Sequence, residues 1–105
     1  MAETLDSALK ERVRAVLGAK PVTEAELRKL SEEGRACELI VSAQLERAER
    51  TLSQLAADPA SSLGEIAATL RDVNELRPDL EELQSLLGEL GERARAFRAS
   101  WLSAG

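Results

Sequence analysis

Apolar residues recur at steps of three and four along most of this chain, and that period is typical of amphipathic α-helices. The first such run spans about residues 4–17. Its apolar positions lie on one helical face and are Leu5, Leu9, Val13 and Val16. Gly18, a residue type that often follows a helix C-terminus, comes directly after the run. The pattern therefore predicts a short N-terminal helix.

A second run covers about residues 23–57 and predicts a long helix, roughly 52 Å if it is continuous. Thr23 and Glu26 have the spacing of a capping box, which marks a helix start. The apolar positions form one stripe: Leu27, Leu30, Gly34, Cys37, Val41, Leu45, Ala48, Leu52 and Leu55. At Gly34 we favour a continuous helix, closely packed against a neighbour, over a break with Ser31 capping a new helix.

The segment 58–62 contains an Asp-Pro pair and predicts a turn. Ser62 and Glu65 then have the spacing of a second capping box. Two further helical runs follow, over about 62–76 and 79–102. The later run carries a narrow apolar stripe: Leu80, Leu83, Leu87, Leu90, Ala94, Phe97 and Trp101.

Pro78 separates these last two runs. A proline is tolerated in the first turn of a helix and is costly in its interior, so it either kinks one long helix or divides two. The predicted fold is all-α and consists of one domain, residues 1–105. It is an elongated, antiparallel, coiled-coil-like hairpin with a short additional N-terminal helix, which makes a three- to four-helix bundle.

The middle of the second helix carries more apolar surface than one packing stripe requires. A further apolar group lies on its other faces: Ala36, Leu39, Ile40 and Ala43. A helix that is apolar nearly all round is buried from more than one side. Either the first helix or a partner chain covers these residues, and we favour the partner chain.

The C-terminal run holds both aromatic residues, Phe97 and Trp101, beside several arginines. Because both aromatics continue the apolar stripe, we favour core packing for them. The main alternative is docking of a partner, with Arg93 and Arg98 beside the aromatic anchors. A peripheral membrane-surface helix is the weaker alternative.

Composition excludes several kinds of chemistry. The chain has no His and a single Cys, so it lacks the commonest general base and any cysteine cluster for zinc. We expect Cys37 to be a small buried residue. With a net charge of −5 and no basic stripe, the chain is not expected to bind nucleic acid. No secretory signal or membrane span is evident in the sequence.

These observations predict a non-enzymatic helical interaction or scaffold protein, without catalytic residues, cofactor or metal. It would be a small subunit of an oligomeric assembly, joined by helix–helix packing to itself or to another helical subunit. The alternative is a monomeric three-helix module that binds a partner peptide or helix near Trp101. We expect an intracellular, cytoplasmic location.

Overall fold

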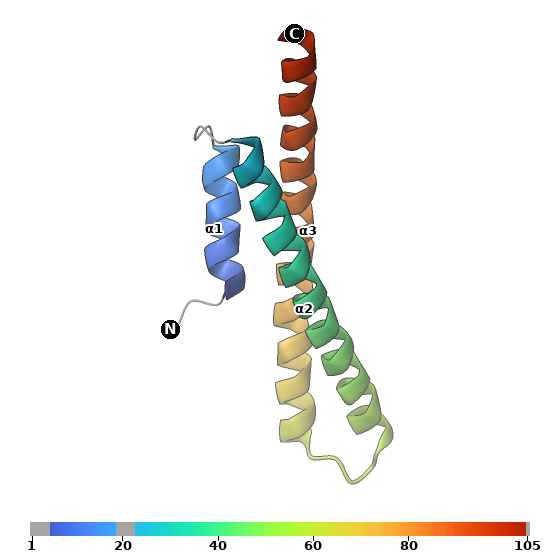
Figure 1. The fold of residues 1–105 in the computed structure, drawn as a ribbon. Coiled ribbons are helices and arrows are strands. Elements are labelled where there is room, and N and C mark those ends of the chain that lie inside the picture. The colour runs from blue at the N-terminus through green and yellow to red at the C-terminus, as the bar shows by residue number, and fades with distance from the viewer. Residues whose placement is uncertain (1–4, 19–22, 105) are drawn as a thin grey trace. The chain divides into compact units, whose positions relative to one another are not determined.

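The computed structural model describes residues 5–18 and 23–104, and every regular element in these ranges is an α-helix (Figure 1). Helix α1 spans Leu5–Leu17, α2 spans Glu24–Ala57 and α3 spans Leu63–Ala104. The predicted all-α class is confirmed. Thr4, which the sequence analysis placed at the start of the first helix, lies outside the described residues.

The ends of α1 and α2 follow local sequence rules. The amide of Gly18 donates a hydrogen bond to the carbonyl of Arg14, at 2.9 Å, directly after α1 ends. At the start of α2 the capping box forms in both directions. The Glu26 amide donates to Thr23 Oγ1 at 3.1 Å, and the Thr23 amide donates to Glu26 Oε2 at 3.4 Å. These bonds satisfy amides that would otherwise lack a partner at a helix start.

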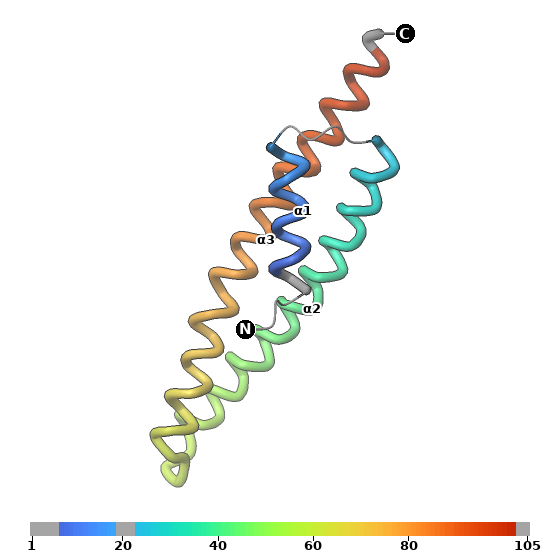
Figure 2. Tube along the Cα trace, turned by 90° about the vertical axis from the view of Figure 1, so that its left-hand side faces the viewer, coloured from blue at the N-terminus to red at the C-terminus, as the bar shows by residue number. Residues whose placement is uncertain are grey.

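Figure 2 shows the turn that joins α2 to α3, and Asp58 makes two hydrogen bonds within it. Its Oδ1 accepts a hydrogen bond from the Ala60 amide at 2.9 Å, and its carbonyl accepts one from the Ser61 amide at 3.1 Å. At the start of α3, the Glu65 amide donates to Ser62 Oγ at 3.1 Å. Among the described residues the Glu65 carboxylate makes no return bond, so the second capping box forms in one direction only.

Gly34 lies within α2, and the helix is continuous through it, as predicted. The predicted reason was close packing against a neighbour, and the structure shows this packing. A Cβ atom placed on Gly34 would overlap with Leu87 Cδ2 and lie 3.3 Å from Leu87 Cγ. The absent side chain is therefore what allows α3 to pack this closely on α2.

Of the two alternatives left open at Pro78, the structure has the single helix, because α3 runs through Pro78 without a division. There are three helices in the described residues, the lower number of the expected three to four. Asp79, expected near a new helix start, lies inside α3 as well. Pro78 and Asn74 are both exposed, so water can reach the Asn74 carbonyl that loses its amide partner.

The chain divides into two compact units. The first consists of residues 1–37 and 83–105, and it brings together α1, the beginning of α2 and the end of α3. All three helices contribute to its buried core: Leu9, Val13, Val16, Leu27, Leu30, Cys37, Leu83, Leu86 and Leu90. Leu86 was not part of the predicted stripe, whereas Leu87 was and is only half-buried. Lys10 is buried as well, at 5% exposed.

Polar contacts also join the three helices of the first unit. Arg12 of α1 forms an ion pair with Glu33 of α2, with 2.8 Å between Nη1 and Oε2. Arg93 of α3 donates a hydrogen bond from Nη2 to the carbonyl of Leu17, at 2.9 Å. Because Leu17 is the last residue of α1, this bond satisfies a carbonyl that has no partner within its own helix.

The second unit, Glu38–Glu82, contains the end of α2, the turn and the beginning of α3. Its core is thin, because its buried apolar side chains are only Val41, Leu45 and Val73. An exposed ion pair between Arg77 Nη2 and Glu49 Oε2, at 3.4 Å, links its two helices. Such exposed pairs contribute little stability, so this unit depends on its narrow apolar contact.

Candidate protein-interaction surfaces

The first candidate surface is the apolar group on α2 that lies off the core. Leu39 is 72% exposed and Ile40 is 54% exposed. Ala36 and Ala43 are exposed as well. The four residues recur at i, i+3, i+4 and i+7, which places them on one side of the helix. We call this group the outer stripe.

The outer stripe lies away from the buried side of the same helix. On a helix that turns about 100° per residue, Leu39 lies about 160° around the axis from Val41. Val41 is buried, at 6% exposed. The α2 helix therefore carries a buried apolar side and, roughly opposite to it, an exposed one.

The second candidate surface is the end of α3. Trp101 is 71% exposed and Leu102 is 83% exposed, whereas Phe97 is half-buried. The expectation of core packing is therefore wrong for Trp101. Arg98 pairs with Glu24, the first residue of α2, so the turns of α3 after Arg98 extend past the start of that helix.

The two arginines predicted to flank the aromatics have partners within the first unit. Arg93 donates to the carbonyl of Leu17, as described above. Arg98 lies 3.4 Å from the carboxylate of Glu24, measured from Nε to Oε1. Both side chains therefore link helices of the unit.

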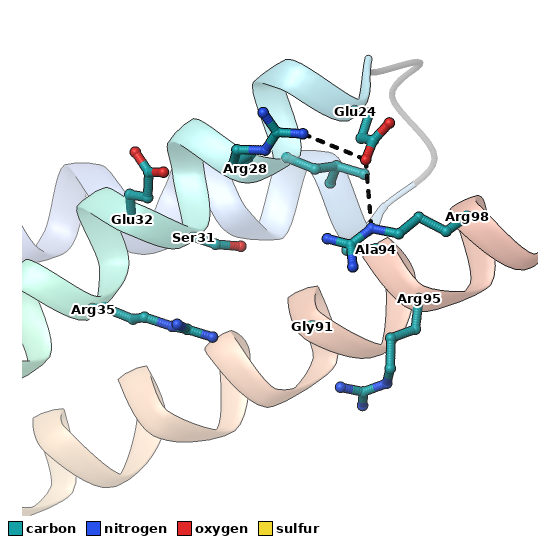
Figure 3. Close-up of a pocket in the computed structure, with 10 residues that line it drawn as sticks. Glu24, Arg28, Ser31, Glu32, Arg35, Gly91, Ala94, Arg95 and Arg98 are labelled. Atoms are coloured by element: carbon teal, nitrogen blue, oxygen red, sulfur yellow. Dashed lines mark ion pairs between the residues drawn. The ribbon is translucent and has the colours of Figure 1, made fainter.

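A cleft between α2 and α3 in the first unit was not anticipated from the sequence (Figure 3). It has a volume of about 280 Å³. Its charged lining consists of Arg28, Arg35, Arg95, Arg98, Glu24 and Glu32, and its other lining residues are Leu27, Ser31, Gly91 and Ala94. On each helix every lining residue lies three or four positions from another one, and this spacing was visible in the sequence. The sequence did not show which two helix faces meet across the cleft.

Cys37 is buried, as predicted. No group of three or more His, Cys, Asp and Glu side chains in the described ranges is arranged to hold a metal ion. No described helix combines the length and the apolar character needed to cross a membrane.

Across residues 5–18 and 23–104 the fold is all-α and consists of three helices. Comparison of the chain with models of protein families, with curated proteins and with solved structures finds no match.

Proposed function

We propose that this chain is a non-enzymatic helical interaction protein, a small subunit of a homo- or hetero-oligomeric assembly joined by helix–helix packing. The observation that carries the proposal is the outer stripe of α2, where Leu39 and Ile40 are 72% and 54% exposed. Two large aliphatic side chains flanked by alanines form a surface onto which another helix can pack closely. The thin core of the second unit supports the same proposal, since a two-helix hairpin buries little apolar surface by itself.

The mass of the purified chain in solution tests this proposal. We expect an oligomer at micromolar concentration if the partner is a second copy. Burying an aliphatic side chain stabilises by roughly 1.5–3 kcal/mol, so replacing Leu39 and Ile40 together by Glu should weaken association by more than about a hundredfold. Leu63→Glu is the matched control, because Leu63 is 84% exposed and lies on another helix. The control should leave the mass unchanged.

The hetero-oligomeric form makes a different prediction. The chain would be monomeric alone and would co-purify with another helical subunit from its own cells. The Leu39→Glu, Ile40→Glu double variant should lose that subunit, and Leu63→Glu should retain it. A stably folded monomer whose co-purifying proteins are unaffected by the double variant would contradict both forms. Cell fractionation in the same experiment tests the proposed cytoplasmic location.

The exposed end of α3 favours a second candidate function, a monomeric three-helix module that binds a partner peptide or helix near Trp101. Its support is the 71% exposure of Trp101 beside Leu102, because exposed tryptophans frequently become central anchors of interfaces. Trp101→Ala should then abolish partner binding, while the free chain keeps the mass of a monomer. In the oligomer hypothesis, by contrast, the outer stripe controls binding.

A further inference from the structure

The cleft between α2 and α3 has a charge pattern that the helical core does not require. At Gly34 the absence of a side chain lets α3 pack closely on α2, and the cleft extends from this contact toward the start of α2. Its lining includes the small residues Ser31, Gly91 and Ala94. Because these side chains are short, they leave space between the two helices, and four arginines are among the other lining residues.

The arginines of the cleft differ in how they are paired. A single carboxylate oxygen, Glu24 Oε1, lies 3.6 Å from Arg28 Nη2 and 3.4 Å from Arg98 Nε. Within the described ranges, Arg35 and Arg95 form no ion pair or hydrogen bond. Two guanidinium groups of the cleft thus share one carboxylate, and two have none.

The directions of the side chains add to this imbalance between arginines and carboxylates. Figure 3 shows the Arg35 guanidinium extending toward α3, whereas the Glu32 carboxylate points to the other side of α2. Arg95 folds back along α3, and its Nη1 would lie 3.8 Å from a Cβ placed on Gly91. Four arginines and two glutamates leave the lining with a formal charge of +2 in a chain whose net charge is −5.

We propose that this cleft binds a phosphate monoester, with Arg35 and Arg95 as the principal ligands of the phosphate. The planar guanidinium fork matches the paired oxygens of phosphate. A phosphate monoester carries a charge of about −1.5 to −2 near pH 7, which balances the lining, whereas one carboxylate balances half of it. The volume of about 280 Å³ suits the phosphate and a small attached group. This inference does not depend on the outer stripe or on oligomer formation.

The test is a titration of the full chain with inorganic phosphate at constant ionic strength. The amide signals in NMR spectra monitor binding. We expect shifts at Ser31, Gly91 and Ala94 that chloride at the same ionic strength does not produce. Arg35→Gln and Arg95→Gln should each weaken binding about tenfold, since each removes hydrogen bonds to a charged group. Arg71→Gln is the matched control, because Arg71 is exposed, lies in the other unit and changes the net charge equally.

A variant that is expected to bind phosphate more tightly provides a second test. Glu24→Gln removes the carboxylate that competes for Arg28 and Arg98, so phosphate should bind severalfold more tightly. Glu46→Gln, an exposed residue of the second unit, changes the charge equally and should have no such effect. This comparison separates the cleft from a general response to net charge.

A parallel titration with a short phosphoserine peptide distinguishes the sources of the phosphate. If that peptide binds at least as tightly as inorganic phosphate and its serine counterpart does not, the ligand is a phosphorylated partner. If only inorganic phosphate binds, the ligand is a small phosphate compound. The proposal is overturned if phosphate acts no differently from chloride, or if Arg35→Gln, Arg95→Gln and Arg71→Gln bind it equally.

Discussion

The contact between Gly34 and Leu87 makes a quantitative prediction, because two glycines of the first unit differ in their surroundings. A Cβ on Gly34 would overlap with Leu87 Cδ2, whereas a Cβ on Gly88 would meet nothing within 4 Å. Both glycines lie in helix interiors. Replacing either one by Ala gains about 0.5–1 kcal/mol of helix stability. Only Gly34→Ala also forces the opposing side chain to move.

The steric term decides the outcome at Gly34. Overpacking a close helix contact costs about 1–3 kcal/mol, and Leu87 can yield only in part because its Cγ would also lie 3.3 Å from the new Cβ. We therefore expect Gly88→Ala to stabilise the protein by about 0.5–1 kcal/mol. Gly34→Ala should be about 1–3 kcal/mol less stable than Gly88→Ala.

Denaturant unfolding followed by far-ultraviolet circular dichroism measures both variants, at a concentration where the mass is known. A parallel thermal scan should separate their midpoints, because 1 kcal/mol corresponds to roughly 4–8 °C in a domain of this size. In a Leu87→Ala background the overlap is gone, so Gly34→Ala should then stabilise like Gly88→Ala. Equal stabilisation by the two alanines in the wild-type background would refute the close contact.

Four further predictions follow from the fold. Leu90→Ala, at a fully buried position, should cost about 2–5 kcal/mol of unfolding free energy in the same denaturant assay. Thr23→Ala removes the side-chain half of the α2 capping box and should cost about 0.5–2 kcal/mol, and unchanged stability would contradict the cap. Pro78→Ala should stabilise by about 1–3 kcal/mol, since it restores an amide donor for Asn74, and a loss of stability would show that the helix is not continuous there. Trp101 fluorescence should be quenched by acrylamide almost as strongly as that of a free tryptophan derivative, and strong protection would contradict its exposure.

The sequence predicted the helices well because the forces that form them are local. The period of apolar residues located α1 and α2, and the capping box at Thr23 located the start of α2. The stripe through Val41 was correct as well, since it is buried. Each of these features depends on residues within a few positions along the chain.

The sequence left open whether Pro78 kinks one helix or divides two, and this ambiguity has a physical reason. A proline in a helix interior costs about 3 kcal/mol, and a local rule therefore predicts a boundary. On either side of it, Val73 and Leu83 are buried at 3% and 0% exposed. Burial of such side chains, each within its own unit, offsets the loss of one solvent-accessible hydrogen bond. Local sequence cannot weigh that tertiary gain.

The candidate surfaces also depend partly on the local sequence and partly on the tertiary structure. The sequence by itself determined that Leu39 and Trp101 lie on apolar faces, because helical period fixes which residues share a face. Only the tertiary structure decided that both are exposed and that the arginines of two helices line one cleft. The helical period determines which side chains share a helix face. Their burial depends on whether another helix extends far enough to cover them. For Trp101, α2 begins near Arg98 and leaves the last turns of α3 uncovered.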